Sequence, residues 1–233
     1  MTIELPASVS LVTGPSELPL LHITNSRATV EIFLTGAHIS GFAPAGHRNV
    51  LFMSRETQFE EGKALRGGIP ICGPWFGPGR DGNSKPAHGF FRNAVWEVTS
   101  ASDDGEETTV ELTLPPSALK GVPGAQGWPA DATVVYRVTV GTRLTAALTV
   151  TAGDAPLDLQ AALHSYFEVA DVRRIRIEGL AGASYLDKLT QQTHTQEGPV
   201  TISAETDRVY NSEAECVVVD PAHRRSITVA KAG

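Results

Sequence analysis

Hydrophobic and polar residues alternate along much of this chain with the period of two that is typical of β-strands. Residues 28–34 (ATVEIFL) and 108–114 (TTVELTL) alternate cleanly. The longer runs 132–140 and 143–151 are rich in β-branched residues and are separated by a two-residue turn, which predicts a hairpin. Further strands are expected at residues 9–14, 19–24, 37–44, 50–53, 94–100, 157–169, 173–178, 200–203, 215–219 and 226–231.

Helical periodicity is almost absent from the sequence. One short helix is expected over residues 55–61, with Ser54 as its N-cap and Gly62 after its end, and residues 179–188 are interpreted as a connection. Around a dozen strands spaced about 8–15 residues apart predict an all-β fold, an antiparallel sandwich or an open barrel. Because no linker and no internal repeat is visible, residues 1–233 are expected to form a single domain.

The stretch 63–96 interrupts the strand pattern. It holds seven of the 22 glycines, four of the 15 prolines and two of the three tryptophans. No regular element tolerates this density of Gly and Pro, so the stretch is expected to be a folded loop. It also carries Trp75, Phe76, Phe90 and Phe91, whose aromatic surface requires burial or a ligand. We therefore interpret the stretch as one wall of a binding site.

Composition narrows the class of partner. The 233 residues are 41% hydrophobic with a net charge of −7, which argues against binding to nucleic acid or to an anionic membrane. No apolar window approaches the ~18 residues that a membrane-spanning helix needs, and the N-terminus does not resemble a secretory signal. A small-molecule partner remains, and an anion could still bind through a local cluster of arginines or backbone N–H groups.

Cysteine and histidine spacing gives no indication of a metal site. Cys72 and Cys216 lie far apart and form no CxxC motif, so a disulfide framework or a structural zinc site is not expected. The seven histidines show no HExxH or comparable spacing. The sequence therefore predicts no cofactor and no metal, and two reduced thiols in a cytoplasmic protein.

His164 is the first candidate for chemistry. In the run AALHSYF, strand alternation would place it on one face with Ala162, Tyr166 and Glu168, in the middle of a strand. A strand would hold the imidazole rigidly against whatever covers that face, as a general acid or base requires. The alternative is a histidine whose hydrogen bonds are satisfied within the sheet.

Two arginines flank the Gly/Pro-rich loop. Arg66 and Arg92 could hold a dianion between their planar guanidinium groups, or they could simply form surface salt bridges. His88, which precedes Gly89, is either a site residue or a turn histidine. Asp207 in ETDRVY is most simply a turn carboxylate.

Three longer motifs together resemble a known family. RGGIPICGPWFG, PAHGFFRNAVWEV and LHSYFEV are similar to the hexose-6-phosphate mutarotases (glucose-6-phosphate 1-epimerases) of the aldose-1-epimerase superfamily. The resemblance covers most of residues 30–230. It implies a β-sandwich of the galactose-mutarotase type, with a small-molecule sugar phosphate bound in a groove on the concave face and no cofactor or metal.

The resemblance also implies roles for individual residues. His164 matches the catalytic acid of the family and His88 its second active-site histidine. Arg66 and Arg92 match the arginines that bind the phosphate, and Asp207 matches a carboxylate that contacts sugar hydroxyls. The implied reaction interconverts α and β anomers, because acid and base together open the pyranose ring and close it on the other carbonyl face.

One part of the family pattern has no counterpart. The general base of the family is a glutamate in a late strand, in a motif resembling CVE or CIEP. The run CVVVDP resembles that motif only superficially, with Asp220 in place of the glutamate, and it matches an earlier strand pair better. The chain is therefore expected to lack the last C-terminal strands of the family, and a truncated chain is favoured over a natural variant without the base.

Three functions follow in order of preference. The first is a monomeric hexose-6-phosphate mutarotase, with glucose 6-phosphate as the expected substrate. A mutarotase of unphosphorylated aldoses is disfavoured because neutral sugars would leave Arg66 and Arg92 without an anion. A non-catalytic sugar-phosphate-binding module is the third alternative, and the missing glutamate is its main support.

Overall fold

The computed structural model describes residues 3–232, which fall into two compact units divided between Glu168 and Val169. The described chain is almost entirely antiparallel β-structure. The first unit contains strands β1 (Val9–Thr13), β2 (Pro19–Thr24), β3 (Ala28–Phe33), β4 (His38–Pro44), β5 (Ile71–Cys72), β6 (Glu97–Asp103), β7 (Thr108–Thr113), β8 (Thr133–Val140), β9 (Leu144–Thr151) and β10 (Ala162–Leu163). Its three short 3-10 helices are η1 (Pro15–Glu17), η2 (Phe91–Asn93) and η3 (Pro116–Leu119).

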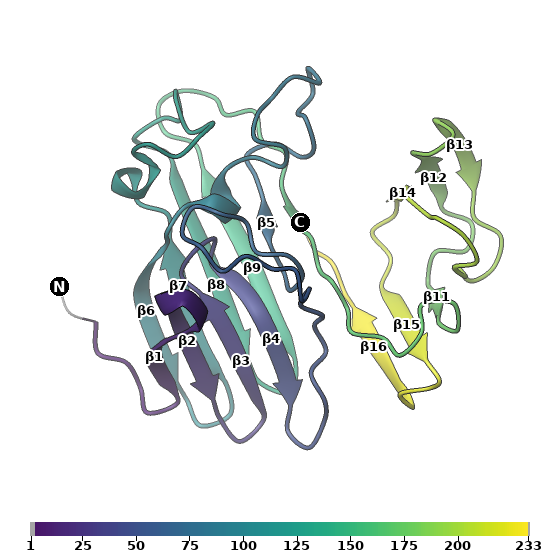
Figure 1. The fold of residues 1–233 in the computed structure, drawn as a ribbon, viewed down its shortest axis with the longest axis horizontal. Coiled ribbons are helices and arrows are strands. Elements are labelled where there is room, and N and C mark those ends of the chain that lie inside the picture. The colour runs from purple at the N-terminus through teal and green to yellow at the C-terminus, as the bar shows by residue number, and fades with distance from the viewer. Residues whose placement is uncertain (1–2, 233) are drawn as a thin grey trace. The chain divides into compact units, whose positions relative to one another are not determined.

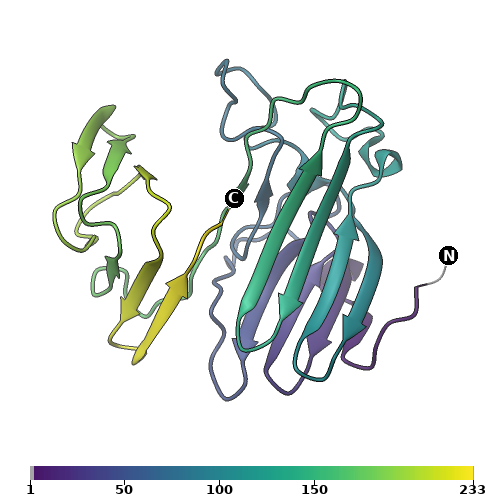
Figure 2. The same ribbon diagram turned by 180° about the vertical axis from the view of Figure 1, so that it is seen from behind.

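Two four-stranded sheets form the body of the first unit. Their strand orders are β1-β2-β3-β4 and β6-β7-β8-β9, and neighbouring strands are consecutive in sequence and antiparallel. Figures 1 and 2 show the two sheets as stacked layers from opposite sides. The predicted all-β antiparallel sandwich is confirmed, and the sheets remain open rather than closing into a barrel.

Alternation along the strands builds the core between these sheets. On β8, Val134, Tyr136 and Val138 are at most 2% exposed, and they face the equally buried Val30 and Ile32 of β3 across one hydrophobic cluster. Because every second side chain of a strand points to the same face, this pattern buries one face and leaves the other to solvent. The alternation in the sequence thus places the two layers.

Polar contacts hold the edge of the sandwich in register. Asn25, in the turn between β2 and β3, donates through Nδ2 to Oγ1 of Thr108 at 3.0 Å and to the carbonyl of Val140 at 2.9 Å. Thr108 belongs to β7 and Val140 to β8, so one amide links the two sheets. A half-buried amide with its hydrogen bonds satisfied favours one alignment of the layers.

The second unit contains two three-stranded antiparallel sheets (Figure 1, green to yellow). One has the order β11-β15-β16 and the other β13-β12-β14. The strands are β11 (Arg176–Glu178), β12 (Ser184–Asp187), β13 (Gln192–Thr195), β14 (Arg208–Asn211), β15 (Cys216–Asp220) and β16 (Arg225–Val229). The expectation that residues 1–233 form a single domain stays a prediction.

The predicted helix at residues 55–61 is wrong. The segment contains turns instead, because the hydroxyl of Ser54 accepts the N–H of Glu56 at 3.2 Å and the Ser54 carbonyl accepts the N–H of Thr57 at 3.2 Å. Serine can satisfy a turn as well as a helix N-terminus, and Phe59, which packs on Phe33, is the one apolar residue of 55–61, so a helix there would have no apolar stripe. Ser54 therefore bonds within a turn, and its predicted role as a helix N-cap is wrong together with the helix.

Several strand predictions also need correction. Residues 157–169 form only the two-residue strand β10, residues 50–53 contribute isolated bridges, and residues 200–203 contribute a single bridge from Val200 to Ile177. Residues 179–188, expected as a connection, instead include β12. Short segments that pair with irregular partners carry too little periodicity to be assigned from sequence.

Candidate active site

The Gly/Pro-rich loop is anchored to the sandwich by a small strand pair. Ile71 of β5 lies opposite Leu163 of β10, and Cys72 lies opposite Ala162. This pairing brings the two motifs RGGIPIC and ALHSYF together although about 90 residues separate them in the chain. The loop therefore forms a wall beside the segment that carries the candidate acid.

Two glycines allow the loop to approach its neighbours closely. Gly68 has φ +60°, and a Cβ there would lie 2.3 Å from the carbonyl oxygen of Ile39 and 2.6 Å from Nε2 of His38. Gly89 has φ +70°, and a Cβ there would lie 2.0 Å from the carbonyl oxygen of Gly73. No side chain fits at either position, which explains the glycines in the RGG and HGFF motifs.

His164 stands directly after β10 rather than in the middle of a strand. Its backbone N–H donates to the carbonyl of Pro70 at 3.1 Å, and the N–H of Tyr166 donates to Gly68 at 2.8 Å, so the segment remains tied to the loop. Nδ1 of His164 is buried and has no hydrogen-bond partner among the described residues. The ring packs 4.9 Å from that of Tyr166. Nε2 is then the nitrogen left for chemistry.

His88 lies close to His164. The centroids of its ring and the ring of His164 are 6.3 Å apart, with the planes at 71°. The N–H of Gly77 donates to Nδ1 of His88 at 3.2 Å, and His88 has φ 68°, which is unusual for a residue with a side chain. The structure thus brings the two predicted histidines together.

Phe76 is a contact residue whose role the sequence did not specify. Its ring meets the edge of His88 at 4.7 Å and lies nearly parallel to His164 at 6.4 Å, with an interplanar angle of 17°. The other aromatic side chains of the loop pack inward, with Phe90 and Phe91 at most 1% exposed. The aromatic density of the loop signalled burial or a ligand, but only the fold separates Phe76 from its neighbours.

Arg92 and Arg66 are not engaged in ion pairs. Among the described residues, no carboxylate lies within ion-pair distance of either guanidinium, so the salt-bridge alternative is wrong. Nη2 of Arg92 donates to the carbonyl of Ala87 at 2.7 Å, whereas Arg66 is exposed. The amide of Asn93, next to Arg92, donates to Gly62 at 2.8 Å and so ties η2 to the segment that leads to Arg66.

A buried histidine lies behind this wall. His38 is 1% exposed, and burial, together with the positive charge of Arg92, lowers its pKa to about 4 against an opposing contact with the Gly67 backbone. Burial also raises the pKa of the Cys72 thiol, although Arg92 opposes this shift. Both groups are therefore neutral near pH 7, so the positive charge of Arg92 is not shared with a second cation beneath it.

The two aspartates of the sequence analysis belong to the second unit. Asp207 is exposed, with Oδ2 3.7 Å from Nζ of Lys188, and its predicted contact with sugar hydroxyls stays a prediction. Asp220 is 1% exposed, and its carboxylate accepts from the N–H of Ala170 at 3.1 Å and from the N–H of His223 at 3.2 Å, with Nδ1 of His223 2.9 Å from Oδ2. Because this carboxylate is buried and bonded to its own unit, it is not exposed to a sugar in solution.

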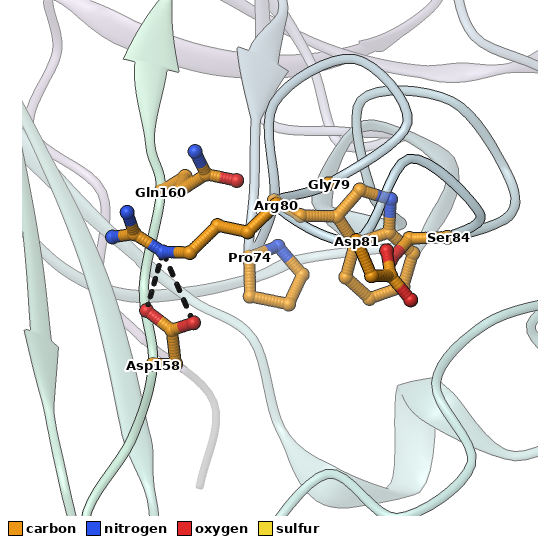
Figure 3. A pocket seen from close by; sticks show the side chains of 8 residues that line it. Pro74, Gly79, Arg80, Asp81, Ser84, Asp158 and Gln160 are labelled. Atoms are coloured by element: carbon orange, nitrogen blue, oxygen red, sulfur yellow. Dashed lines mark hydrogen bonds and ion pairs between the residues drawn. The ribbon is translucent and has the colours of Figure 1, made fainter.

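A separate cavity of about 220 Å³ lies beside the loop, lined in part by Trp75 and Gln160 (Figure 3). Figure 3 shows Arg80 reaching across to Asp158, with Nε 3.1 Å from both carboxylate oxygens. The two side chains are 63% and 71% exposed, so this ion pair contributes little stability. None of the five predicted site residues lines this cavity.

Neither a metal cluster nor a membrane-spanning helix is found among the described residues. Within residues 3–232, no group of three or more His, Cys, Asp or Glu side chains is arranged to hold a metal ion. None of the helices among these residues has the length and apolar character needed to cross a lipid bilayer.

Comparison with known proteins identifies relatives over nearly the whole chain. The family model of the aldose 1-epimerases matches residues 19–233. A protein of Escherichia coli K12 named "putative glucose-6-phosphate 1-epimerase" is 35% identical over 218 residues, which cover 91% of this chain and 70% of that protein. A protein of Cenchrus ciliaris with the same name is 30% identical over 245 residues, which cover 99% of this chain and 72% of that protein.

Solved structures give the same result for the fold. A crystal structure of a "putative mutarotase" from Salmonella typhimurium aligns with a TM-score of 0.85 and 32% identity, covering 97% of this chain and 75% of that one. A galactose mutarotase-like protein from Clostridium acetobutylicum aligns with a TM-score of 0.68 at 12% identity, covering 94% of this chain and 79% of that one, and supports the fold alone.

Proposed function

The chain belongs to the aldose 1-epimerase family, as its motifs predicted, and from this premise we propose that it interconverts the α and β anomers of a hexose 6-phosphate, glucose 6-phosphate foremost. It is an isomerase of the epimerase class. The choice of a phosphorylated hexose is supported by the names of the bacterial and plant relatives and by the chemistry of the site.

One observation carries the substrate class. Two imidazoles, His88 and His164, lie 6.3 Å apart, and the same loop presents Arg66 and Arg92 without a carboxylate partner among the described residues. Guanidinium groups without an internal anion favour a ligand that brings its own negative charge. A neutral sugar would satisfy the imidazoles and leave both cations unpaired.

The histidines take different parts in the proposed reaction. Because Nδ1 of His88 accepts a hydrogen bond from Gly77, its proton resides on Nε2, which can donate to a sugar oxygen without giving up the proton. His164 has no such bond on the described residues and acts as the acid, since imidazole exchanges protons readily near neutral pH. In this proposal His88 binds a sugar oxygen, and His164 transfers the proton.

Ring opening follows from these positions. His164 delivers a proton to the ring oxygen while a base removes the proton of the anomeric hydroxyl, so that the bond from C1 to the ring oxygen breaks and an aldehyde forms. Rotation about C1–C2 presents the other carbonyl face, and the reversed proton transfers close the ring as the other anomer. One such acid–base pair contributes ~10²–10⁴-fold, which suffices for a reaction that also proceeds unaided.

In this proposal the arginines position the substrate and take no part in proton transfer. When the guanidinium groups of Arg66 and Arg92 hold the phosphate, one end of the sugar is fixed and the ring oxygen comes to rest near His164. Positioning of this kind converts encounters into a unimolecular step. Asp207 is proposed to contact sugar hydroxyls, as the family resemblance implies.

Exchange between anomers of glucose 6-phosphate tests the proposal directly. Saturation-transfer NMR on the two anomeric protons would be run with this chain, with His164→Ala and with glucose as the unphosphorylated substrate. We expect exchange above the protein-free rate that is lost in His164→Ala and absent for glucose. Equal exchange of glucose would overturn the phosphate assignment, and binding of glucose 6-phosphate without exchange would make the chain a binding module.

Location and oligomeric state complete the proposal. The two cysteines, Cys72 and Cys216, are both free thiols, which is typical of proteins in a reducing compartment. We propose a monomer acting in the cytoplasm. Light scattering of the purified chain measures the oligomeric state, and a stable dimer would contradict that part.

A further inference from the structure

The second unit contains a basic cavity that shares no residue with the candidate active site. It has a volume of about 410 Å³ and lies on the sheet β11-β15-β16, where Arg176, Arg224 and Arg225 line it together with Ser226. Three arginines along one cavity are unusual in a chain whose net charge is −7. The lining of this cavity is therefore positively charged, although the chain as a whole is negative.

Strand register explains how the cavity is assembled. Arg176 of β11 lies opposite Val219 of β15, and Val219 lies opposite Ser226 of β16. Side chains in one row across a sheet point to the same face, so the guanidinium and the hydroxyl flank Val219. The turn between β15 and β16 adds Arg224 at the end of the same face.

Two carboxylates lie near these arginines, and one of them, Asp220, lies opposite Arg225 and offsets its charge. Asp220 is 1% exposed and its oxygens accept from the N–H of Ala170 and the N–H of His223, so Arg176 and Arg224 carry the charge that is open to a ligand. Glu178 accepts from Nε of Arg176 at 2.8 Å, in a pair whose side chains are 43% and 46% exposed. An exposed pair of this kind leaves the outer N–H groups of Arg176 available.

Arg224 occupies a backbone position that suits a different residue. Its φ is 52°, in the left-handed region, which is strained for a residue with a side chain and unstrained for glycine. No hydrogen bond or ion pair of the Arg224 side chain is formed with the described residues. The turn therefore holds an arginine in a strained backbone conformation. The guanidinium of this arginine has no partner among the described residues and is available to a ligand.

We propose that this cavity binds the phosphate group of a small phosphorylated metabolite. A phosphate dianion has two negative charges and several acceptor oxygens, which match several forked guanidinium donors better than a carboxylate does. The volume leaves room for a group attached to the phosphate, within the usual range of small-molecule sites. This site is independent of the proposed mutarotase reaction, and its test reads binding rather than turnover.

Calorimetric titration with inorganic phosphate tests the site. Arg66→Gln serves as the reference protein, so that phosphate binding at the candidate active site is weakened in every arm. In that background, Arg224→Gly removes the guanidinium and relieves the left-handed backbone, so it is expected to fold at least as well. We expect it to weaken phosphate binding about 10- to 100-fold, the loss of a charge-assisted hydrogen-bond set. Arg176→Gln is a second variant with the same expected direction.

Two controls separate this site from general effects. Gln191→Gly relieves a left-handed residue (φ 60°) in the same unit but outside the cavity, and Arg143→Gln removes an exposed arginine of the first unit. Both are expected to bind phosphate as the reference does. Unchanged binding in Arg224→Gly and Arg176→Gln, or an equal loss in Arg143→Gln, would overturn the proposal.

Further titrants identify the ligand class. Glucose 6-phosphate bound with the same dependence on Arg224 supports a phosphorylated sugar, and binding of inorganic phosphate alone supports the free ion or a different ester. Acetate bound as tightly as phosphate, or glucose bound at all with this dependence, would overturn the phosphate assignment. A failure of anomer exchange has no bearing on these outcomes, because no arm measures turnover.

Discussion

The backbone N–H of Gly77 donates to Nδ1 of His88 across 3.2 Å. This bond assigns the tautomer of His88, because a nitrogen that accepts a hydrogen bond carries no proton and the proton must sit on Nε2. The loop that holds Gly77 therefore presents a neutral N–H donor to the space beside His164. The proposed division of roles between His88 and His164 rests on this single backbone amide.

Removal of that donor should slow the reaction without ending it. His88→Ala is expected to lower kcat/KM for anomer exchange about 10²–10³-fold, the usual cost of one donor to a reacting oxygen. His88→Gln keeps an N–H in a similar place and should retain more activity than His88→Ala. Saturation-transfer NMR on glucose 6-phosphate measures both, and exchange at the wild-type rate in His88→Ala would remove His88 from the site.

Phe76 should act as a positioning residue for both imidazoles. Phe76→Ala removes the contacts at 4.7 Å to His88 and 6.4 Å to His164, and kcat is expected to fall about tenfold to a hundredfold with KM nearly unchanged. Phe76→Tyr should recover most of the rate. Phe59→Ala is the matched control, since that half-buried ring packs on Phe33 instead, and a loss of rate there as large as in Phe76→Ala would indicate general loosening.

Burial of His38 makes stability depend on pH in a defined window. Its pKa is about 4 in the folded chain and 6.5 when exposed, so between these values the unfolded chain binds a proton that the folded chain does not. The free energy of unfolding therefore falls as the pH is lowered through this window, by about 3 kcal/mol in total. Urea unfolding at pH 7, 5.5 and 4 measures the slope.

The contribution of His38 is isolated by substitution. His38→Gln should flatten this part of the pH dependence, whereas the exposed His47→Gln should leave it unchanged. An identical slope in His38→Gln and the unmodified chain would show that other groups cause the pH dependence.

The close approach at Gly68 predicts a large effect of one methyl group. Gly68→Ala places a Cβ 2.3 Å from the carbonyl oxygen of Ile39 at φ +60°, and overpacking with backbone strain should destabilise the chain by about 2–4 kcal/mol. Gly62→Ala, at φ +79° with no atom within 4 Å, pays only the backbone term of about 1 kcal/mol. Urea unfolding compares the two, and equal losses would contradict the steric argument.

A buried hydroxyl offers a route to higher stability. Tyr136 is 0% exposed, its Oη has no hydrogen-bond partner among the described residues, and burial raises the pKa of its phenol. Tyr136→Phe removes an unsatisfied polar atom and should raise the free energy of unfolding by about 1 kcal/mol. Trp96→Phe is the contrast, because Nε1 of Trp96 donates to Phe91 at 2.9 Å and the change should destabilise. A loss of stability in Tyr136→Phe would reveal a partner for the hydroxyl.

Regular strands and a set of candidate site residues could be predicted from the chain itself. The strand β8 is encoded locally, because its β-branched residues favour an extended backbone, and residues 132–140 were predicted as a strand. The structure adds that Val134, Tyr136 and Val138 form its buried face. The Gly/Pro-rich loop was likewise predicted from its composition. The resemblance of the motifs to a known family then identified His88 and His164 as candidate site residues. The short helix after Ser54 failed because a hydroxyl that caps a helix also caps a turn.

Tertiary structure decided what lies far apart in sequence. The pairing of β5 with β10 sets His88 and His164 6.3 Å apart, and it turns Phe76, but not Phe90, toward them. The register of β11, β15 and β16 likewise gathers Arg176 and Arg224 around one cavity, although the sequence shows only two separate basic runs. Periodicity indicates which face of a strand a side chain takes. Distances between elements depend on how the whole chain packs, and each of these sites requires side chains from separate elements to lie close together.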